Sequence, residues 1–423
     1  MFGKHPHSTT DRWTDSIYSA KILLKWLLIG TVVGLIVGAV SSAFGHALIY
    51  VNQLRAKLPW LLLLLPVGGL VIVFLYRFFK NTDDRGTNMV ISSIHSSTDV
   101  PFKMAPLIFI STVITHLCGG SAGREGAAIQ LGGSIANKLG KVIRLNDNDR
   151  RMIIMCGMSA GFSALFGTPL AAAIFSLEVI SIGIMHYSAL VPCVTASMVG
   201  HFVAAFLKVP PEVFPVTEIP AMDPLGFFKI TVFAAAVGAV SILFCRCLHS
   251  AEHLYKKYLK NPYLRIVTAG VLVILLAWLL GGENLGSGMG IIEHIFHEGE
   301  TKPYNFLLKM VFTALTLGAG FKGGEIVPSF TIGAAFGCAV ASLMGLPVPL
   351  AAACGMVGVF CGVTNCPLTA LLISFELFGF AGMPYYLTTV AVSYMLSGNY
   401  GLYHAQKIIY SKTETKYVNT TTH

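Results

Sequence analysis

Two glycine-rich segments, one in each half of the sequence, place a carboxylate where an apolar stretch begins. Residues 119–126 read GGSAGREG and residues 318–328 read GAGFKGGEIVP, so the carboxylates are Glu125 and Glu325. A glycine-rich turn that opens a helix exposes backbone N–H groups without intrahelical acceptors, and the helix dipole makes that end attractive to anions. An ionised carboxylate there competes with an anion for the same donors, and protonation removes the competition. The two segments therefore predict anion-binding helix ends whose occupancy depends on protons.

Glu125 and Glu325 are the candidate proton-handling residues, because ionisable side chains within apolar sequence usually serve transport. Each has a structural alternative. Glu125 can form a salt bridge with its neighbour Arg124, and Glu325 can be a helix N-cap that faces an aqueous vestibule. A third glycine-marked opening, DRGTNM, offers the hydroxyl of Thr87 and the amide of Asn88 as further donors to an anion.

The elements that position these residues must lie in a membrane. Of the 423 residues, 54% are apolar and 12% are charged, and the mean hydropathy is +0.70, whereas a soluble protein has about 25% charged residues. The net charge of +9 comes from basic clusters between apolar runs, a pattern set by membrane topology and anionic lipid. This pattern argues against a nucleic-acid partner.

Six apolar segments are long enough to span a bilayer, which takes about 20 residues. They are 22–50, 59–79, 188–207, 226–248, 264–281 and 304–320. Shorter apolar pieces bounded by Gly or Pro lie at 86–95, 104–118, 125–139, 152–166, 169–183, 326–344, 348–363, 367–380 and 384–396. Broken helices are tolerated at membrane depth only where protein or a water-filled cavity satisfies their ends. The pattern predicts the all-α polytopic core of a transporter or channel.

An internal repeat divides the chain into two related halves. CGM at 156–158 recurs at 354–356, an offset of 198 residues, and Glu178 matches Glu376 at the same offset. Repeats combined with broken helices place a substrate site near the bilayer midplane, between the halves. The predicted parts are a polar cytoplasmic N-terminal segment, two membrane repeats and a polar C-terminal tail, at 1–19, 20–207, 226–410 and 411–423.

Other polar groups favour structural roles. Glu178 and Glu376 lie in apolar runs of both halves, which favours acceptance of backbone N–H bonds over transport chemistry. His294 and His297 form an HxxHE pattern rather than the HExxH of a zinc helix, so neither a metal nor another cofactor is expected. The nine cysteines include no CxxC pair. No nucleophile–base pair is evident, so the chain is not expected to be an enzyme.

Four segments resemble motifs of the CLC family of anion channels and anion/proton antiporters. GREG at 123–126 is similar to the motif in which the glutamate gates the anion path. GEIVP at 324–328 resembles the G-x-F-x-P segment that closes the anion site, and GSGMG at 286–290 resembles a further motif. Tyr403 resembles the tyrosine whose hydroxyl coordinates the central anion, with Tyr400 as a neighbouring candidate.

Departures from the usual motifs point to one branch of that family. Most members read GSGIP where this chain has GTNMV at 86–90, so the usual central serine is absent. The candidates for its place are Thr87, Asn88 and Met89. Coupled members carry an inner glutamate where this chain has Val179, yet Glu325 stands where most members have an apolar residue. This combination resembles the fluoride/proton antiporter branch, although that branch often has Thr where this chain has Val327.

The resemblance covers roughly residues 20–410 and implies a fold of two inverted repeats with about 18 tilted and broken helices. It implies a homodimer in membrane lipid that exchanges a halide, fluoride before chloride, for protons across the cell (inner) membrane, with both termini cytoplasmic. The alternatives are a chloride/proton antiporter and an uncoupled CLC anion channel. The implied proton and gating residues are Glu125 and Glu325. The implied anion-binding residues are Thr87, Asn88, Met89, Gly123, Arg124, Gly126, Ile326, Val327 and Tyr403.

Overall fold

The computed structural model describes residues 9–81, 85–96, 99–216 and 218–423, with side chains from Tyr18 onward. The elements of the first half are α1 (Thr9–Lys57), the 3-10 helix η1 (Pro59–Leu64), α2 (Leu65–Phe78), α3 (Thr87–His95), α4 (Met104–Leu117), α5 (Glu125–Val142), α6 (Asp147–Phe166), α7 (Pro169–Glu178), β1 (Ser181–Ile182), the 3-10 helix η2 (Tyr187–Ala189) and α8 (Leu190–Phe206). Those of the second half are α9 (Pro224–Tyr258), α10 (Pro262–Leu280), α11 (Met289–Glu298), α12 (Asn305–Gly318), α13 (Ile326–Met344), α14 (Val348–Thr364), α15 (Pro367–Phe378), α16 (Met383–Leu396), β2 (Lys407–Tyr410) and β3 (Tyr417–Thr421). Most of the predicted N-terminal segment, 1–19, lies outside the residues whose side chains are described.

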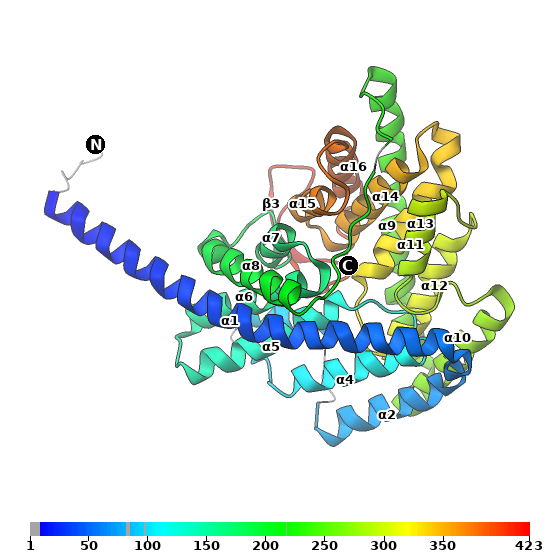
Figure 1. Cartoon of the computed structure of the whole chain (residues 1–423), viewed down its shortest axis with the longest axis horizontal. Helices are drawn as coiled ribbons and strands as arrows, with labels where there is room; N and C mark the ends of the chain where they lie inside the picture. Colours follow the sequence, from blue (N-terminus) through cyan, green and yellow to red (C-terminus); the bar gives the residue numbers. More distant parts are fainter. Residues whose placement is uncertain (1–8, 82–84, 97–98, 217) are drawn as a thin grey trace.

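The order of helices in the first half, α1 to α8, recurs in the second as α9 to α16, and the halves form two inverted repeats. Figure 1 shows the first half, blue to green, beside the second half, which runs from green through yellow to red, with the C-terminal end of the chain near the middle. Gly123 before α5 and Gly324 before α13 form an antiparallel bridge, so the N-terminal ends of these two helices lie where the two halves meet.

Six helices of the described chain are long and apolar enough to cross a membrane. Five of them coincide with predicted spans. The sixth predicted span, 304–320, is wrong: α12 has only 14 residues, and the long helix of that region is Ile326–Met344. The glycine-rich turn after α12, where Gly320 takes a φ of 110°, ends that helix before it can cross.

Glycines allow the helices at the centre to touch backbone to backbone. A Cβ on Gly157 of α6 would lie 2.2 Å from the carbonyl oxygen of Gly132 in α5. The equivalent pair in the second half is as close, since a Cβ on Gly355 of α14 would lie 2.1 Å from the carbonyl oxygen of Gly333 in α13. No larger residue fits at either crossing, so these small residues fix how α5 and α13 are held.

Glu178 and Glu376 join the two repeats by capping each other's helices. The Glu178 carboxylate at the end of α7 accepts the N–H groups of Leu368 and Thr369 at 3.0 and 2.9 Å, in the first turn of α15. In return, the Glu376 carboxylate of α15 accepts the N–H groups of Leu170 and Ala171, both at 2.9 Å, in the first turn of α7. The predicted structural role of the two carboxylates is confirmed, because each satisfies helix N-terminal donors that have no other acceptor.

The segment 411–423, predicted as a polar tail, partly folds back as a strand. β2 pairs in parallel with β1 and antiparallel with β3. The hydroxyl of Thr422 donates to the carbonyl of Tyr403 at 2.6 Å. The small sheet thus fixes the segment that carries Tyr403 against the core of the otherwise helical fold.

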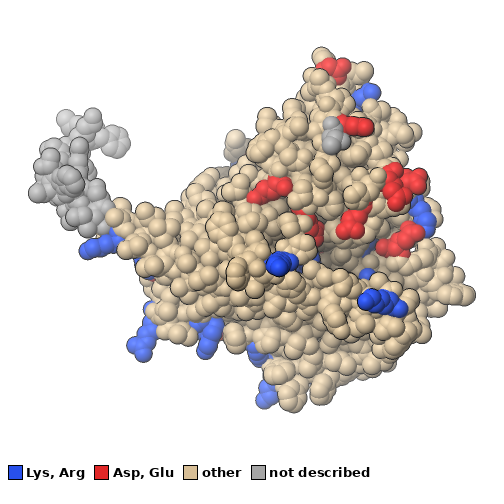
Figure 2. All heavy atoms as spheres, viewed as in Figure 1, with Lys and Arg blue, Asp and Glu red and all other residues tan. Residues whose placement is uncertain are grey.

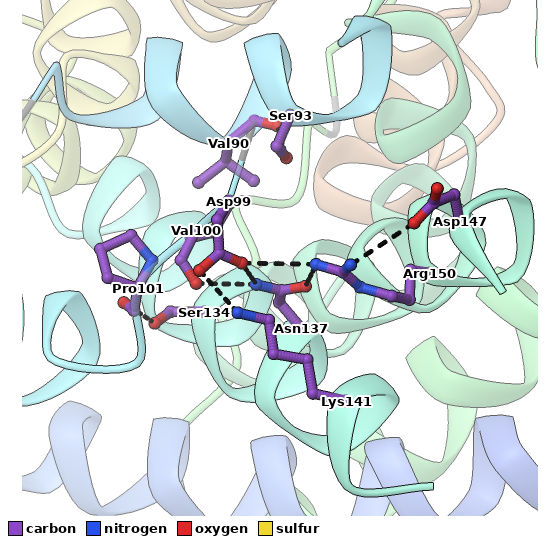
Figure 3. A network of polar contacts seen from close by, with 10 residues as sticks. All are labelled: Val90, Ser93, Asp99, Val100, Pro101, Ser134, Asn137, Lys141, Asp147 and Arg150. Carbon is purple, nitrogen blue, oxygen red and sulfur yellow. Dashed lines mark hydrogen bonds and ion pairs between the residues drawn. The ribbon is translucent and has the colours of Figure 1, made fainter. Parts of the chain in front are cut away.

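A polar network on one side of the molecule fixes the far end of α5. Asn137 donates to the Asp99 carboxylate at 2.9 Å and to the carbonyl of Val100 at 2.7 Å. Lys141 of α5 and Arg150 of α6 donate to the same carboxylate at 2.6 and 3.3 Å (Figure 3). One acidic side chain from the link before α4 therefore ties the end of α5 to the beginning of α6, which helps to orient the helix that Glu125 opens.

Charge is distributed unevenly over the surface. On the face drawn in Figure 2, acidic side chains gather over its upper part, several basic ones line the lower edge, and most of the area between them is uncharged. Exposed apolar side chains such as Leu28, Phe74, Phe206 and Trp278 belong to the candidate spans. Exposed apolar side chains of this kind are the ones that a bilayer covers.

Candidate functional site

The two glycine-rich segments lie against each other as one antiparallel bridge. The N–H of Gly123 donates to the carbonyl of Gly324 at 2.7 Å, and the N–H of Gly324 donates to the carbonyl of Gly123 at 2.8 Å. A Cβ on Gly324 would lie 2.7 Å from the backbone nitrogen of Gly126. Because α5 and α13 begin directly after this bridge, their N-termini, one from each repeat, open side by side.

The first turns of α5 and α13 supply unpaired backbone donors at this point. Gly126 lies in the first turn of α5, and Ile326 and Val327 begin α13, where no carbonyl precedes them within the helix to accept their N–H groups. Ile326 and Val327 are fully buried. The sequence-predicted anion-binding positions at the two helix ends are therefore neighbours, in surroundings that exclude bulk water.

Glu125 is the first residue of α5 and is completely buried. Its Oε2 accepts the N–H of Arg124 at 3.2 Å, and its Oε1 lies 3.4 Å from Arg124 Nε. The salt bridge considered as an alternative is therefore present. It does not exclude the gating role, because the carboxylate lies at the helix opening and the 3.4 Å contact is long for a charge-assisted hydrogen bond.

Glu325 occupies the N-cap position of α13, but its side chain makes no capping hydrogen bond. The N-cap position of the capping alternative is therefore present, but its capping hydrogen bond is not. Its Oε2 is buried without a hydrogen-bond partner among the described residues, and it lies 3.3 Å from where a Cβ of Gly126 would be. A buried carboxylate oxygen without a donor is costly when ionised, so this group is well suited to carry a proton.

The third glycine-marked opening reaches the same place through α3. A Cβ on Gly126 would also lie 3.4 Å from the Thr87 hydroxyl, and that hydroxyl accepts a hydrogen bond from Gln130 of α5 at 3.3 Å. The side-chain oxygen of Asn88 instead accepts the N–H of Ala405 at 2.9 Å. Met89 packs against the hydrophobic core. Of the three candidates for the central position, Thr87 lies beside the opening of α5.

Tyr403 is almost fully buried, and its hydroxyl has no hydrogen-bond partner among the described residues. Buried tyrosine hydroxyls usually have a hydrogen-bond partner. The Tyr403 hydroxyl is therefore available to donate to an anion. The alternative, Tyr400, lies under the Arg246 guanidinium at 5.7 Å from its ring centroid, and it does not line the cavity described next.

A cavity of about 590 Å³ leads to this group of residues from one side of the molecule. Thr87, Asn88, Glu325 and Tyr403 all line it. Its other charged lining residues are Arg77, Arg85, Glu252, Lys256, Arg265 and Lys322. The excess of cations raises the local concentration of anions in a cavity with low-dielectric walls.

Two charged residues near the site were missed by the sequence analysis. Lys309 of α12 is completely buried, and Glu212, in the link between α8 and α9, forms an ion pair with Arg124. A lone lysine within the apolar run 304–320 was a signal that pointed to Lys309. Nothing local distinguished Glu212, because the same link contains two other acidic residues, Glu218 and Asp223, and its partner lies 88 residues away in the sequence.

Broken helices that meet end to end, and a cationic cavity that leads to them, define an integral membrane protein of the transporter and channel class. The family model described as voltage gated chloride channel matches residues 68–398. The chain therefore belongs to that family, the CLC family, as the motifs predicted, and the family consists of transporters and channels rather than enzymes.

Relatives and solved structures agree with this assignment. A chloride/fluoride channel protein of Pseudomonas syringae pv. tomato is 38% identical over 398 residues, which cover 92% of this chain and 88% of that protein. An H(+)/Cl(-) exchange transporter ClcA of Vibrio campbellii is 24% identical and covers 83% of this chain and 81% of that protein. The crystal structure of a CLC-type fluoride/proton antiporter matches with a TM-score of 0.87 and 33% identity, over 95% of this chain and 99% of that one. A slow cyanobacterial Cl-/H+ antiporter shares the fold, with a TM-score of 0.77 and 19% identity.

Proposed function

We propose that this protein is a secondary transporter that exchanges a halide for protons, with fluoride as the preferred halide. The observation that carries the proposal is the bridge between Gly123 and Gly324, which brings Glu125 and Glu325 of the two repeats to neighbouring helix openings. Two carboxylates beside unpaired N–H donors can alternate between ionised and protonated forms, whereas a simple anion pore needs only the donors. The solved structure at 33% identity, a fluoride/proton antiporter, supports fluoride. The relative at 38% identity is named for both chloride and fluoride.

In the proposed cycle, anions enter the cationic cavity and bind at the first turns of α5 and α13, beside Thr87 and Tyr403. Ionised Glu125 occupies the same donors and blocks the path. Protonation removes its attraction for the N–H groups, so the anion takes the place of the carboxylate. Because one site holds either the anion or the ionised carboxylate, protons and anions move in opposite directions.

The proposal includes the setting of the protein. Basic residues cluster around the cavity and in the links next to it, at Arg77, Arg85, Lys256 and Lys257, and short loops rich in Lys and Arg usually face the cytoplasm. The cavity and the C-terminal strands beside it are therefore cytoplasmic, in the cell (inner) membrane. Two copies form a homodimer, each with its own anion path.

Purified protein in liposomes tests the proposal directly. Vesicles loaded with fluoride or with chloride are followed with ion-selective and pH electrodes together. Fluoride efflux accompanied by proton uptake is expected, with much slower efflux of chloride. Chloride exchange at the same rate indicates a chloride/proton antiporter, anion efflux without proton movement indicates a channel, and retention of both anions refutes anion transport.

Replacing Glu325 with Gln is expected to weaken coupling, so that fewer protons move per fluoride ion. The amide keeps the shape of the side chain but cannot carry a proton, so the proton that Glu325 holds in the proposed cycle is lost. The ratio of proton to fluoride flux in liposomes measures the effect, with Glu300→Gln, an exposed carboxylate, as the control. An unaltered flux ratio would remove Glu325 from the proton pathway.

A further inference from the structure

Arg124 is shared between two carboxylates, and only one of them belongs to the proposed gate. Its Nε faces Glu125 Oε1 at 3.4 Å, and its NH2 group forms a closer ion pair with Oε1 of Glu212. The side chains of Arg124, Glu125 and Glu212 are 15%, 0% and 12% exposed. One buried cation therefore serves two anions, so this triad carries one negative charge in excess when both carboxylates are ionised.

Glu212 is held in place by the backbone of both repeats. It lies in the link after α8, where Pro211 packs against the position that a Cβ of Gly167 would take, at 3.0 Å. Two residues further on, the N–H of Phe214 donates to the carbonyl of Leu377 in α15 at 2.9 Å. The link thus has a fixed path, and the carboxylate of Glu212 approaches Arg124 from a set direction.

The second oxygen of Glu212 is buried and has no hydrogen-bond partner among the described residues. Burial raises the pKa of Glu212 to about 7, the charge of Arg124 opposes this, and the carboxylates of Glu125 and Glu293 add to it. The charged groups that face Glu212 are therefore Arg124 before α5, Glu125 in α5 and Glu293 in α11. Its charge state is therefore set first by its burial and then by these three neighbours.

We propose that Glu212 is a positioning residue that sets how readily the gate Glu125 takes up a proton. It acts in two ways with the same sign. Its charge repels the Glu125 carboxylate, and its ion pair draws the Arg124 guanidinium away from Glu125. Both effects destabilise the ionised gate and so favour the protonated form from which the anion can pass. This role rests on the proposed function, since it concerns the proton step of the same exchange.

Neutralising Glu212 is expected to shift the pH dependence of exchange to lower pH. In Glu212→Gln, the negative charge that repels the Glu125 carboxylate is gone, and Arg124 no longer pairs with a second carboxylate. The ionised form of Glu125 is therefore favoured, and a lower pH is needed to protonate it. Charge neighbours at this range shift a titration by about 1 pH unit or more. The half-maximal rate of fluoride-coupled proton flux should move by about that amount, and the rate on the alkaline side of the profile should fall roughly tenfold.

Three further variants separate this role from a general structural one. Glu212→Asp keeps the charge and should restore most of the profile. Glu218→Gln, an exposed carboxylate of the same link, should leave it unchanged. In a Glu125→Gln background, which is expected to move fluoride without protons, the readout is fluoride efflux at different pH values. Glu212→Gln should not change the pH dependence of that efflux, because the group through which it acts is gone. Melting temperature and gel filtration verify that each protein is folded.

The outcomes are distinct from those of the transport test. If the wild-type protein exchanges fluoride for protons but Glu212→Gln has an unchanged or more alkaline profile, the role of Glu212 is refuted and the proposed function stands. A pH shift that persists in the Glu125→Gln background also refutes it, since Glu212 would then affect transport without acting through Glu125. If the wild type moves no protons, the proposed function itself fails.

Discussion

Glu125→Gln is expected to abolish proton movement while fluoride still leaves the vesicles. The amide has nearly the shape of a protonated carboxyl group, so the side chain no longer competes for the N–H donors at the opening of α5, where Glu125 is completely buried. Without a titratable group there, the anion and the proton lose their common site. Anion flux should become independent of pH, and proton flux should fall to the level of protein-free liposomes.

Electrodes for fluoride and pH, read in the same vesicle preparation, check this result. Glu300→Gln, which removes an exposed carboxylate, is the matched control and should retain wild-type coupling. Proton movement that continues at the wild-type ratio in Glu125→Gln would mean that another group gates the path. Loss of both fluxes in a protein that is still folded would instead give the carboxylate a role in binding the anion.

Lys309→Met is expected to weaken fluoride binding and to lower thermal stability. Lys309 Nζ donates to Ser121 Oγ at 3.0 Å and to the carbonyls of Asn284 and Gly286 at 3.1 and 2.8 Å. Three donors matched by three neutral oxygens are the pattern of an ammonium group. No carboxylate forms an ion pair with it among the described residues, so its charge remains as a positive potential next to the glycine-rich segment that precedes Glu125.

Removing this charge has two separate consequences, one for anion affinity and one for stability. A unit charge roughly 10 Å from an anion contributes about 1.7 kcal/mol at an effective dielectric constant of about 20, so the fluoride concentration for half-maximal flux should rise on the order of tenfold. Burying an ammonium group without a carboxylate costs several kcal/mol of desolvation, on the order of what the three hydrogen bonds return. Methionine, of similar length and apolar, avoids that cost but leaves the buried carbonyl of Asn284 without the donor at 3.1 Å. A buried acceptor without a partner costs about 1–3 kcal/mol, so the melting temperature should fall.

The concentration dependence of fluoride efflux and the melting temperature in detergent measure the two effects. Lys302→Met removes an exposed lysine that pairs with Glu283, and it should change neither quantity greatly. A fall in melting temperature together with unchanged fluoride affinity would show that Lys309 serves only to hold the two loops together.

Much of the architecture followed from local sequence. The broken helices were predicted because short apolar pieces end at Gly or Pro. The structure agrees at the start of four of them, since α5, α7, α14 and α15 begin at the predicted residues. The span predicted at 304–320 was wrong because hydropathy averages over the turn that ends α12. The paired roles of Glu178 and Glu376 were predictable because an internal repeat makes symmetry visible in the sequence.

The sequence alone determined that this chain is a membrane protein and that it consists of two related halves. It also determined that a carboxylate lies at a glycine-rich helix opening in each half. These properties depend on residue type and spacing within short stretches. Only the tertiary structure decided that Gly123 bridges Gly324, that Thr87 rather than Met89 lies beside Gly126, and that Glu212 shares Arg124 with Glu125. Such contacts join residues that are distant along the chain, and their geometry depends on how whole helices cross, which no local pattern records.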